Sequence, residues 1–192
     1  MKNWKQVWRR IKEIIDSSSV PEDSIHARNT LKWIVKLYPK ADRNLKLAAF
    51  SHDIERAIPE KKVKRQDFAD YESFKRAHAI NSANIVADIM RSYKICEEAI
   101  KDVQYLIKNH EYGGSFRADL LKDADSISFF DKNLSFYAKR HDIEEVIRRS
   151  VWGYKRVSDE RKKIVIDILK RKTDQVSKHI LEKLLDLSSE KK

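Results

Sequence analysis

The stretch LAAFSHDIERA at residues 47–57 raises the question on which the interpretation of this chain depends. Four apolar residues and then Ser51 precede His52 and Asp53. An aspartate in that position is expected to be partly buried, and a buried carboxylate needs a cation or several hydrogen-bond donors beside it. A second such pair, His141 and Asp142, lies in the charged context AKRHDIEE. A histidine followed by an aspartate therefore does not by itself identify a site. The positions of the other histidines and aspartates are needed to judge whether this stretch holds a metal.

Composition predicts an all-α protein. Of the 192 residues, 41% are hydrophobic and 37% are charged, and only three glycines and three prolines interrupt the chain. Long stretches rich in Lys, Glu, Leu and Ile favour helices, and their apolar residues recur at three- and four-residue intervals. We expect one helical bundle: a core at residues 1–135 that includes an N-terminal amphipathic helix, and a C-terminal helical extension at residues 136–192 packed on that core.

Several local signals refine this expectation. Ser19 and Glu22 have the spacing of a capping box at the start of a second helix. The charge run EKKVKRQD at residues 60–67 predicts an exposed loop, which could flank a cleft and attract phosphates. The single cysteine, Cys96, excludes an internal disulfide and is expected to be a buried small apolar residue.

Charge and hydropathy limit the location and the partners. No apolar run approaches the roughly 18 residues of a membrane span, and the N-terminus is too charged for a signal peptide, so we expect a cytoplasmic protein. The amphipathic helix with Trp4 and Trp8 could lie on a membrane, but packing on the core is favoured. The net charge of +11 attracts anions. Nucleic acid and a phosphorylated small molecule are both candidates.

The histidines suggest metal binding. His26, His52, His78 and His110 each lie in or at the end of a different apolar-periodic segment, whereas His141 and His179 lie in charged settings. The segment DLLKDADSISFF at residues 119–130 adds Asp123 and Asp125 among apolar residues. Imidazole and carboxylate ligands suit Mn, Fe, Co, Ni or Zn, with Mg possible, and a helical bundle can gather them from several helices.

These segments resemble the HD-domain superfamily of metal-dependent phosphohydrolases. The resemblance covers about residues 20–135, and it rests on five stretches in the order of the superfamily's motifs: IHARNTLKWIV, AAFSHDIERA, RAHAINSANIVADIM, IKNHEYGG and LLKDADSI. It implies an HD-like helical bundle. It also implies hydrolysis of a phosphate ester, most similar to that of dinucleoside polyphosphate hydrolases and cyclic-dinucleotide phosphodiesterases.

The resemblance also implies a ligand set. His26, His52, Asp53 and Asp125 would hold a first metal, and Asp53 would bridge to a second metal held by His78 and His110. Asp125 is preferred to Asp123 because the superfamily's aspartate follows an alanine. His141 and Asp142 lack the apolar lead and are expected to form a surface pair. Whether one ion or two bind stays open at this point.

Cations beside these ligands are candidates for phosphate binding. Arg56 stands where many relatives have a lysine, and Lys75, Arg76 and Lys122 also flank the proposed ligands. Arginine can bind phosphate through two parallel hydrogen bonds, although Arg56 could instead pair with Glu60 or Glu72. We assign catalysis to Asp53, Arg56 and Lys122, and substrate binding to these four cations.

The resulting hypothesis is a metal-dependent phosphohydrolase or phosphodiesterase that acts on a nucleotide or similar ester through a metal-bound hydroxide. One alternative is a basic, non-enzymatic nucleic-acid-binding protein, although no helix-turn-helix, zinc or aromatic-sheet motif supports it. Another is an HD fold retained as a regulatory module. The sequence leaves open which substrate is used and how many chains assemble.

Overall fold

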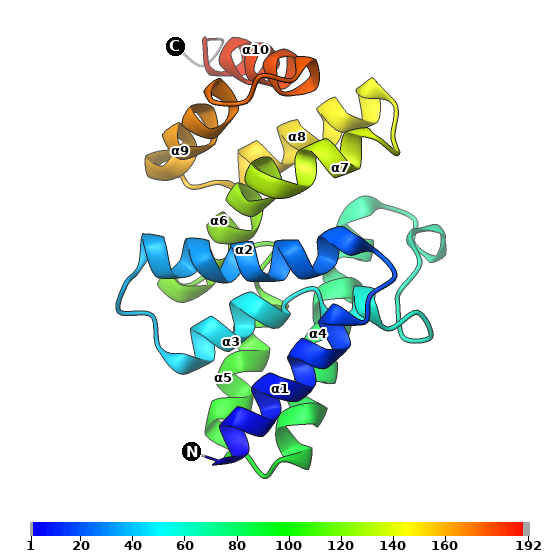
Figure 1. Ribbon diagram of the computed structural model, residues 1–192, viewed down its shortest axis with the longest axis vertical. Coiled ribbons are helices and arrows are strands. Elements are labelled where there is room, and N and C mark those ends of the chain that lie inside the picture. The colour runs from blue at the N-terminus through cyan, green and yellow to red at the C-terminus, as the bar shows by residue number, and fades with distance from the viewer. Residues whose placement is uncertain (1, 190–192) are drawn as a thin grey trace.

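The computed structural model describes residues 2–189 and confirms the all-α prediction, since no strand occurs among those residues (Figure 1). The α-helices are α1 (Lys2–Asp16), α2 (Pro21–Leu37), α3 (Arg43–Ser51), α4 (Tyr71–Ser92), α5 (Glu97–Lys108), α6 (Phe116–Ser128), α7 (Leu134–Ala138), α8 (Ile143–Arg156), α9 (Asp159–Lys170) and α10 (Gln175–Ser189). Short helical turns are η1 (Ile54–Ala57), η2 (Arg65–Asp67) and the π-turn η3 (Phe129–Asn133).

Helices α2 and α6 lie in the middle of the molecule and pack on each other (Figure 1). Helices α1, α3, α4 and α5 lie toward the end that carries the N-terminus, and α8, α9 and α10 lie toward the opposite end. This arrangement brings His26 on α2 and Asp125 on α6 side by side, although 99 residues separate them in the sequence. The C-terminal helices contact α6, η3 and α7, so the extension packs on the core.

Side chains cap four of the helices that carry or flank the site. Asp42, Asp70, Ser115 and Asp142 each accept a hydrogen bond from a backbone amide three residues ahead, at the starts of α3, α4, α6 and α8. Such caps satisfy amides that the helix itself leaves unpaired.

The capping box predicted for Ser19 and Glu22 does not form. Helix α2 begins at Pro21 after Val20, which provides no side-chain cap. The carboxylate of Glu22 is instead buried and paired with Arg140, from the turn before α8. That long-range ion pair could not be seen in the local spacing.

The N-terminal helix packs on the core, as predicted. Val7, Ile11 and Ile15 are buried along one face of α1, and the ring of Trp8 lies 5.5 Å from that of Phe50 in α3. No helix among the described residues is long and apolar enough to span a membrane.

The expectation that Cys96 is buried is wrong. The residue is exposed at the position just before α5, because the adjacent Ile95 occupies the buried position there. The charged segment at residues 60–67 is largely exposed, as predicted.

Candidate metal centre

The fold gathers all six predicted ligands at one buried point. His26 lies on α2, His52 and Asp53 follow α3, and His78 lies on α4; His110 follows α5 and Asp125 lies on α6. Each comes from a different element except the adjacent pair. The four imidazoles are buried, and the Asp53 carboxylate is the most accessible of the six, at 18% exposure.

Three of these residues form a compact first group. Nε2 of His26 lies 3.0 Å from Oδ1 of Asp125 and 3.2 Å from Nε2 of His52. Nε2 of His52 lies 3.5 Å from the same Asp125 oxygen. Asp53 borders this group, with its Oδ2 3.9 Å from Nε2 of His26.

Asp53 also belongs to a second group. Its Oδ1 lies 2.7 Å from Nε2 of His78, 3.6 Å from Nε2 of His52 and 3.8 Å from Nε2 of His110. The carboxylate therefore stands between the two groups of imidazoles. This is the geometry that the resemblance implied for a bridging ligand.

The other ring nitrogen of each histidine is held by an oxygen. Nδ1 of His52 donates to the carbonyl of Ala49 at 3.0 Å, and Nδ1 of His110 donates to that of Ile107 at 2.7 Å. Such partners fix the tautomer of a metal-binding imidazole and leave the Nε2 lone pair facing inward.

His26 and His78 are oriented in the same way. Nδ1 of His26 lies 3.1 Å from the hydroxyl of Ser128, and Nδ1 of His78 lies 2.7 Å from the buried carboxylate of Glu55. Glu55 is a buried residue of the candidate site that the sequence did not single out. A carboxylate behind a ligating histidine raises its basicity.

The donor atoms fit a divalent ion. Ligand atoms about 2.0–2.2 Å from one ion lie about 3 to 3.5 Å from each other, which is the spacing in the first group. Nε2 of His110 is buried and has no hydrogen-bond partner among the described residues. A cation would satisfy this atom, so these buried His, Asp and Glu groups could hold a metal ion.

Charge coupling among these groups is strong. Burial alone lowers the pKa of His52, but the carboxylates of Asp53 and Asp125 raise that pKa overall to about 9. Burial opposes ionisation of Asp53, yet His52, His78 and Arg56 bring the pKa of this carboxyl well below its usual value. The site thus holds its carboxylates ionised, as metal ligands must be.

Glu111 was not anticipated as a site residue. Its Oε1 lies 3.1 Å from Nε2 of His110, and His78, His110 and Glu111 form a third group of donor atoms close enough to share an ion. Lys75 also pairs with this carboxylate. Burial opposes its ionisation, but Arg156 and Lys75 hold the pKa of Glu111 well below its usual value.

The structure distinguishes the two candidate aspartates of α6. Asp125 faces the histidines, whereas Asp123 accepts hydrogen bonds from the backbone amide of Ser158 and from Nη1 of Arg161, both at 2.9 Å. Asp123 therefore ties α6 to the start of α9. The preference for Asp125 agrees with this geometry.

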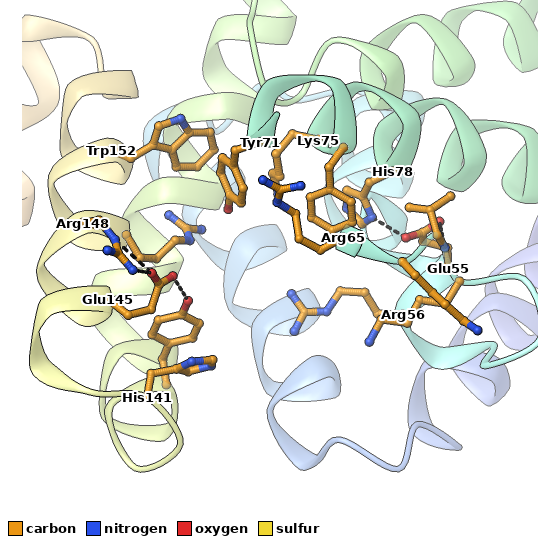
Figure 2. Close-up of a pocket in the computed structure, with 16 residues that line it drawn as sticks. Glu55, Arg56, Arg65, Tyr71, Lys75, His78, His141, Glu145, Arg148 and Trp152 are labelled. Carbon is orange, nitrogen blue, oxygen red and sulfur yellow. Dashed lines mark hydrogen bonds and ion pairs between the residues drawn. The ribbon is translucent and has the colours of Figure 1, made fainter. Parts of the chain in front are cut away.

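A cavity of about 1020 Å³ opens beside His78 and Glu55. Figure 2 shows His78, Glu55 and Arg56 on one side of it and Trp152, Arg148, Glu145 and His141 on the other, with Arg65 and Tyr71 between them. One wall thus carries His78 of the candidate ligand groups, and the opposite wall belongs to α8. The residues that complete the lining are Lys62, Val63, Lys64, Phe74, Lys75, Tyr137 and Arg149.

Only two of the four predicted substrate-binding cations line this cavity. Arg56 does so while paired with Asp23 and Asp53, at 3.1 and 3.4 Å, and not with Glu60 or Glu72. Lys75 lines it too, although Glu111 already pairs with its ammonium group.

Arg76 and Lys122 lie outside the cavity lining. The guanidinium of Arg76 covers the ring of Tyr112, and Lys122 is 3.3 Å from Asp119. Both positions are near ligands in sequence, but their side chains leave the helices in other directions. The geometry lends no support to their assignment to substrate or, for Lys122, to catalysis.

The second His-Asp pair lies apart from the metal-ligand groups, as expected. Asp142 is the exposed cap of α8. His141 is also exposed, but it stacks on Tyr137 with ring centroids 4.1 Å apart and lines the cavity wall, which the sequence analysis did not foresee.

A family model described as a domain of unknown function (DUF4202) matches residues 10–181. This chain belongs to that DUF4202 family. The match spans all six clustered ligands and also Glu55, Glu111 and Arg156, so the family domain includes both the ligand groups and the α8 wall. The comparisons with curated proteins and with solved structures found no match.

Proposed function

We propose that this DUF4202 protein is a metal-dependent phosphohydrolase of the HD superfamily that hydrolyses a nucleotide or a similar phosphate ester. The observation that carries the proposal is the convergence of four Nε2 atoms on the carboxylates of Asp53 and Asp125, beside a large cavity lined by cations. Mn, Fe, Co, Ni and Zn are the ions best suited to this donor set.

A bound divalent ion supplies Lewis acidity, which lowers the pKa of water and offsets charge on phosphoryl oxygens. The protein's own residues hold the groups in position and provide the electrostatic field of the site. Asp53 faces both imidazole groups, so its carboxylate could contribute a ligand to an ion held by either group. Ser128, Ala49, Glu55 and Ile107 keep the ligating rings in place.

Arg56 has the position expected of a phosphate-binding group. It borders both Asp53 and the cavity, and its side chain is 36% exposed. Burial alone would lower the pKa of its guanidinium, but Asp53 and Asp23 raise that pKa, so the group stays charged. A phosphate ester oxygen bound near Asp53 would lie within reach of this guanidinium. The positive charge would then stabilise the negative charge that develops on the phosphoryl oxygens in the transition state.

The test is a hydrolysis screen against a panel of nucleotides and phosphate esters, with Mn²⁺, Fe²⁺, Co²⁺ and Mg²⁺ supplied separately. We expect turnover that requires metal and is abolished in Asp53→Ala. The matched control is Asp88→Ala, which removes a 73% exposed carboxylate from α4 and should leave turnover unchanged. Absence of turnover with every ester and metal, or equal loss in both variants, would contradict the proposal.

A further inference from the structure

The cavity beside the candidate metal centre carries positive charge that the ligand groups do not use. Of the cations that line the cavity, Arg56, Lys75 and Arg148 are each paired with a carboxylate. Among the described residues, no ion pair engages the remaining four lining cations. These are Lys62, Lys64, Arg65 and Arg149.

Arg149 is the most constrained of these four. Its guanidinium lies over the rings of Phe129 and Trp152, at 4.3 and 4.8 Å from their centroids. Its Nη1 is buried and has no hydrogen-bond partner in the described part of the chain. A buried donor without an acceptor is costly, and a ligand oxygen in the cavity would relieve that cost.

The segment that carries Lys62, Lys64 and Arg65 follows η1, and therefore follows the His-Asp motif. It is anchored at its start, because the amide of Val63 donates to Oε2 of Glu55 at 3.4 Å. Glu55 also holds His78. The backbone of this segment is thus tied to the residue that holds His78, and Nη1 of Arg65 also donates to the carbonyl of Phe68 at 2.6 Å.

We propose that Arg149 and the 62–65 segment form a second anion-binding subsite, which takes a phosphate group other than the one at the metal centre. This inference rests on the proposed function and narrows it to substrates that bear at least two phosphate groups. The cavity, at about 1020 Å³, lies at the upper end of the roughly 300–1,000 Å³ usual for small-molecule sites. It therefore has room for a ligand longer than a nucleoside monophosphate.

The aromatic residues of the lining fit the same ligand. Trp152 meets the ring of Tyr71 edge-on at 5.4 Å, and both line the cavity with Phe74. Planar apolar surface beside cations is suited to a nucleobase.

The test compares an adenosine 3′,5′-bisphosphate with adenosine 5′-monophosphate, by kcat/KM of the metal-loaded protein and by equilibrium binding in calorimetry. We expect the wild type to prefer the bisphosphate at least tenfold in both measurements. Lys64→Gln and Arg149→Gln should each reduce that preference several-fold while kcat/KM for the monophosphate changes little. Lys61→Gln is the matched control, because Lys61 is exposed in the same loop but does not line this cavity.

Two outcomes separate this inference from the proposed function. The first is turnover of both esters with no preference for the bisphosphate, or with a preference that Lys64→Gln and Lys61→Gln reduce equally. This outcome would overturn the subsite but would be consistent with the proposed phosphohydrolase activity. A second outcome is that the protein binds the bisphosphate preferentially, that Lys64→Gln weakens this binding, and that neither ester is turned over. This outcome would support the subsite and contradict the proposed phosphohydrolase activity. Lys64 is exposed, so its variant keeps the test open should Arg149→Gln fail to fold.

Discussion

Arg156 of α8 donates from Nη2 to Oδ2 of Asp125 at 3.1 Å, on the side of the carboxylate away from His26. The same nitrogen lies 2.9 Å from Oε2 of Glu111 and donates to the carbonyl of His110 at 2.9 Å. One buried guanidinium from the C-terminal extension thus supports residues of both ligand groups. The extension is therefore part of the site's architecture.

Replacing Arg156 should weaken metal binding. Groups that orient metal ligands typically contribute about 10- to 100-fold in affinity, so we expect a loss in that range for Arg156→Met, with partial recovery in Arg156→Lys. Mn²⁺ titration by calorimetry measures it. Lys155→Met is the control, since Lys155 is the exposed neighbour on the same helix. Equal affinities for Arg156→Met and Lys155→Met would refute this role.

Substitutions of the two aspartates of α6, Asp123 and Asp125, should have different effects on metal binding and on stability. Asp125→Asn should lose metal, because Oδ1 of Asp125 lies within 3.5 Å of two imidazole nitrogens. Asp123→Asn should keep the metal, but its free energy of unfolding should be lower by about 1–3 kcal/mol, because the variant lacks the carboxylate that pairs with Arg161. Metal analysis and urea denaturation of both variants distinguish them. Metal loss in Asp123→Asn with retention in Asp125→Asn would reverse the assignment.

The two-ion arrangement predicts a change in stoichiometry. His78→Ala and His110→Ala should each lower bound metal by about one ion per chain, because these imidazoles face Asp53 from the side away from His26. His179→Ala, on the partly exposed surface of α10, should not change it. Elemental analysis after reconstitution measures this. Unchanged metal content in the first two variants would favour a single ion held by His26, His52, Asp53 and Asp125.

Metal binding should release protons. The carboxylates of Asp53 and Asp125 outweigh burial and raise the pKa of His52 to about 9 in the metal-free protein. Below that pH the imidazole is protonated, and an ion must displace the proton to bind. Apparent affinity should therefore rise with pH up to about 9. Calorimetry near neutral pH, in buffers of different ionisation enthalpy, should show proton uptake by the buffer, and buffer-independent heats would contradict this.

The sequence singled out six residues that the fold brings together, but it did not predict their surroundings. These six candidate ligands could be singled out because the stretches that carry them resemble motifs in a known order. The directions of nearby cations could not be assigned in this way. Residues two apart on a helix face different sides, so Asp123 and Asp125 reach different partners, and Lys122 points at Asp119.

Long-range partners were missed for a related reason. Arg156 follows Asp125 by 31 residues and lies in a stretch that reads only as a charged helix. Glu55 lies two residues after Asp53 and Glu111 directly follows His110, but in the sequence both resemble surface glutamates, and only the fold shows that both are buried. Long-range packing of α8 against the core decides which charges become part of the site.

The metal content of the purified chain tests the central claim most directly. The protein would be stripped with chelator, reconstituted with Mn²⁺ or Fe²⁺, freed of excess ion by gel filtration and subjected to elemental analysis beside Asp53→Ala. The account predicts one to two ions per chain in the wild type and a clear loss in the variant. A wild-type protein that is folded and retains no ion would contradict it.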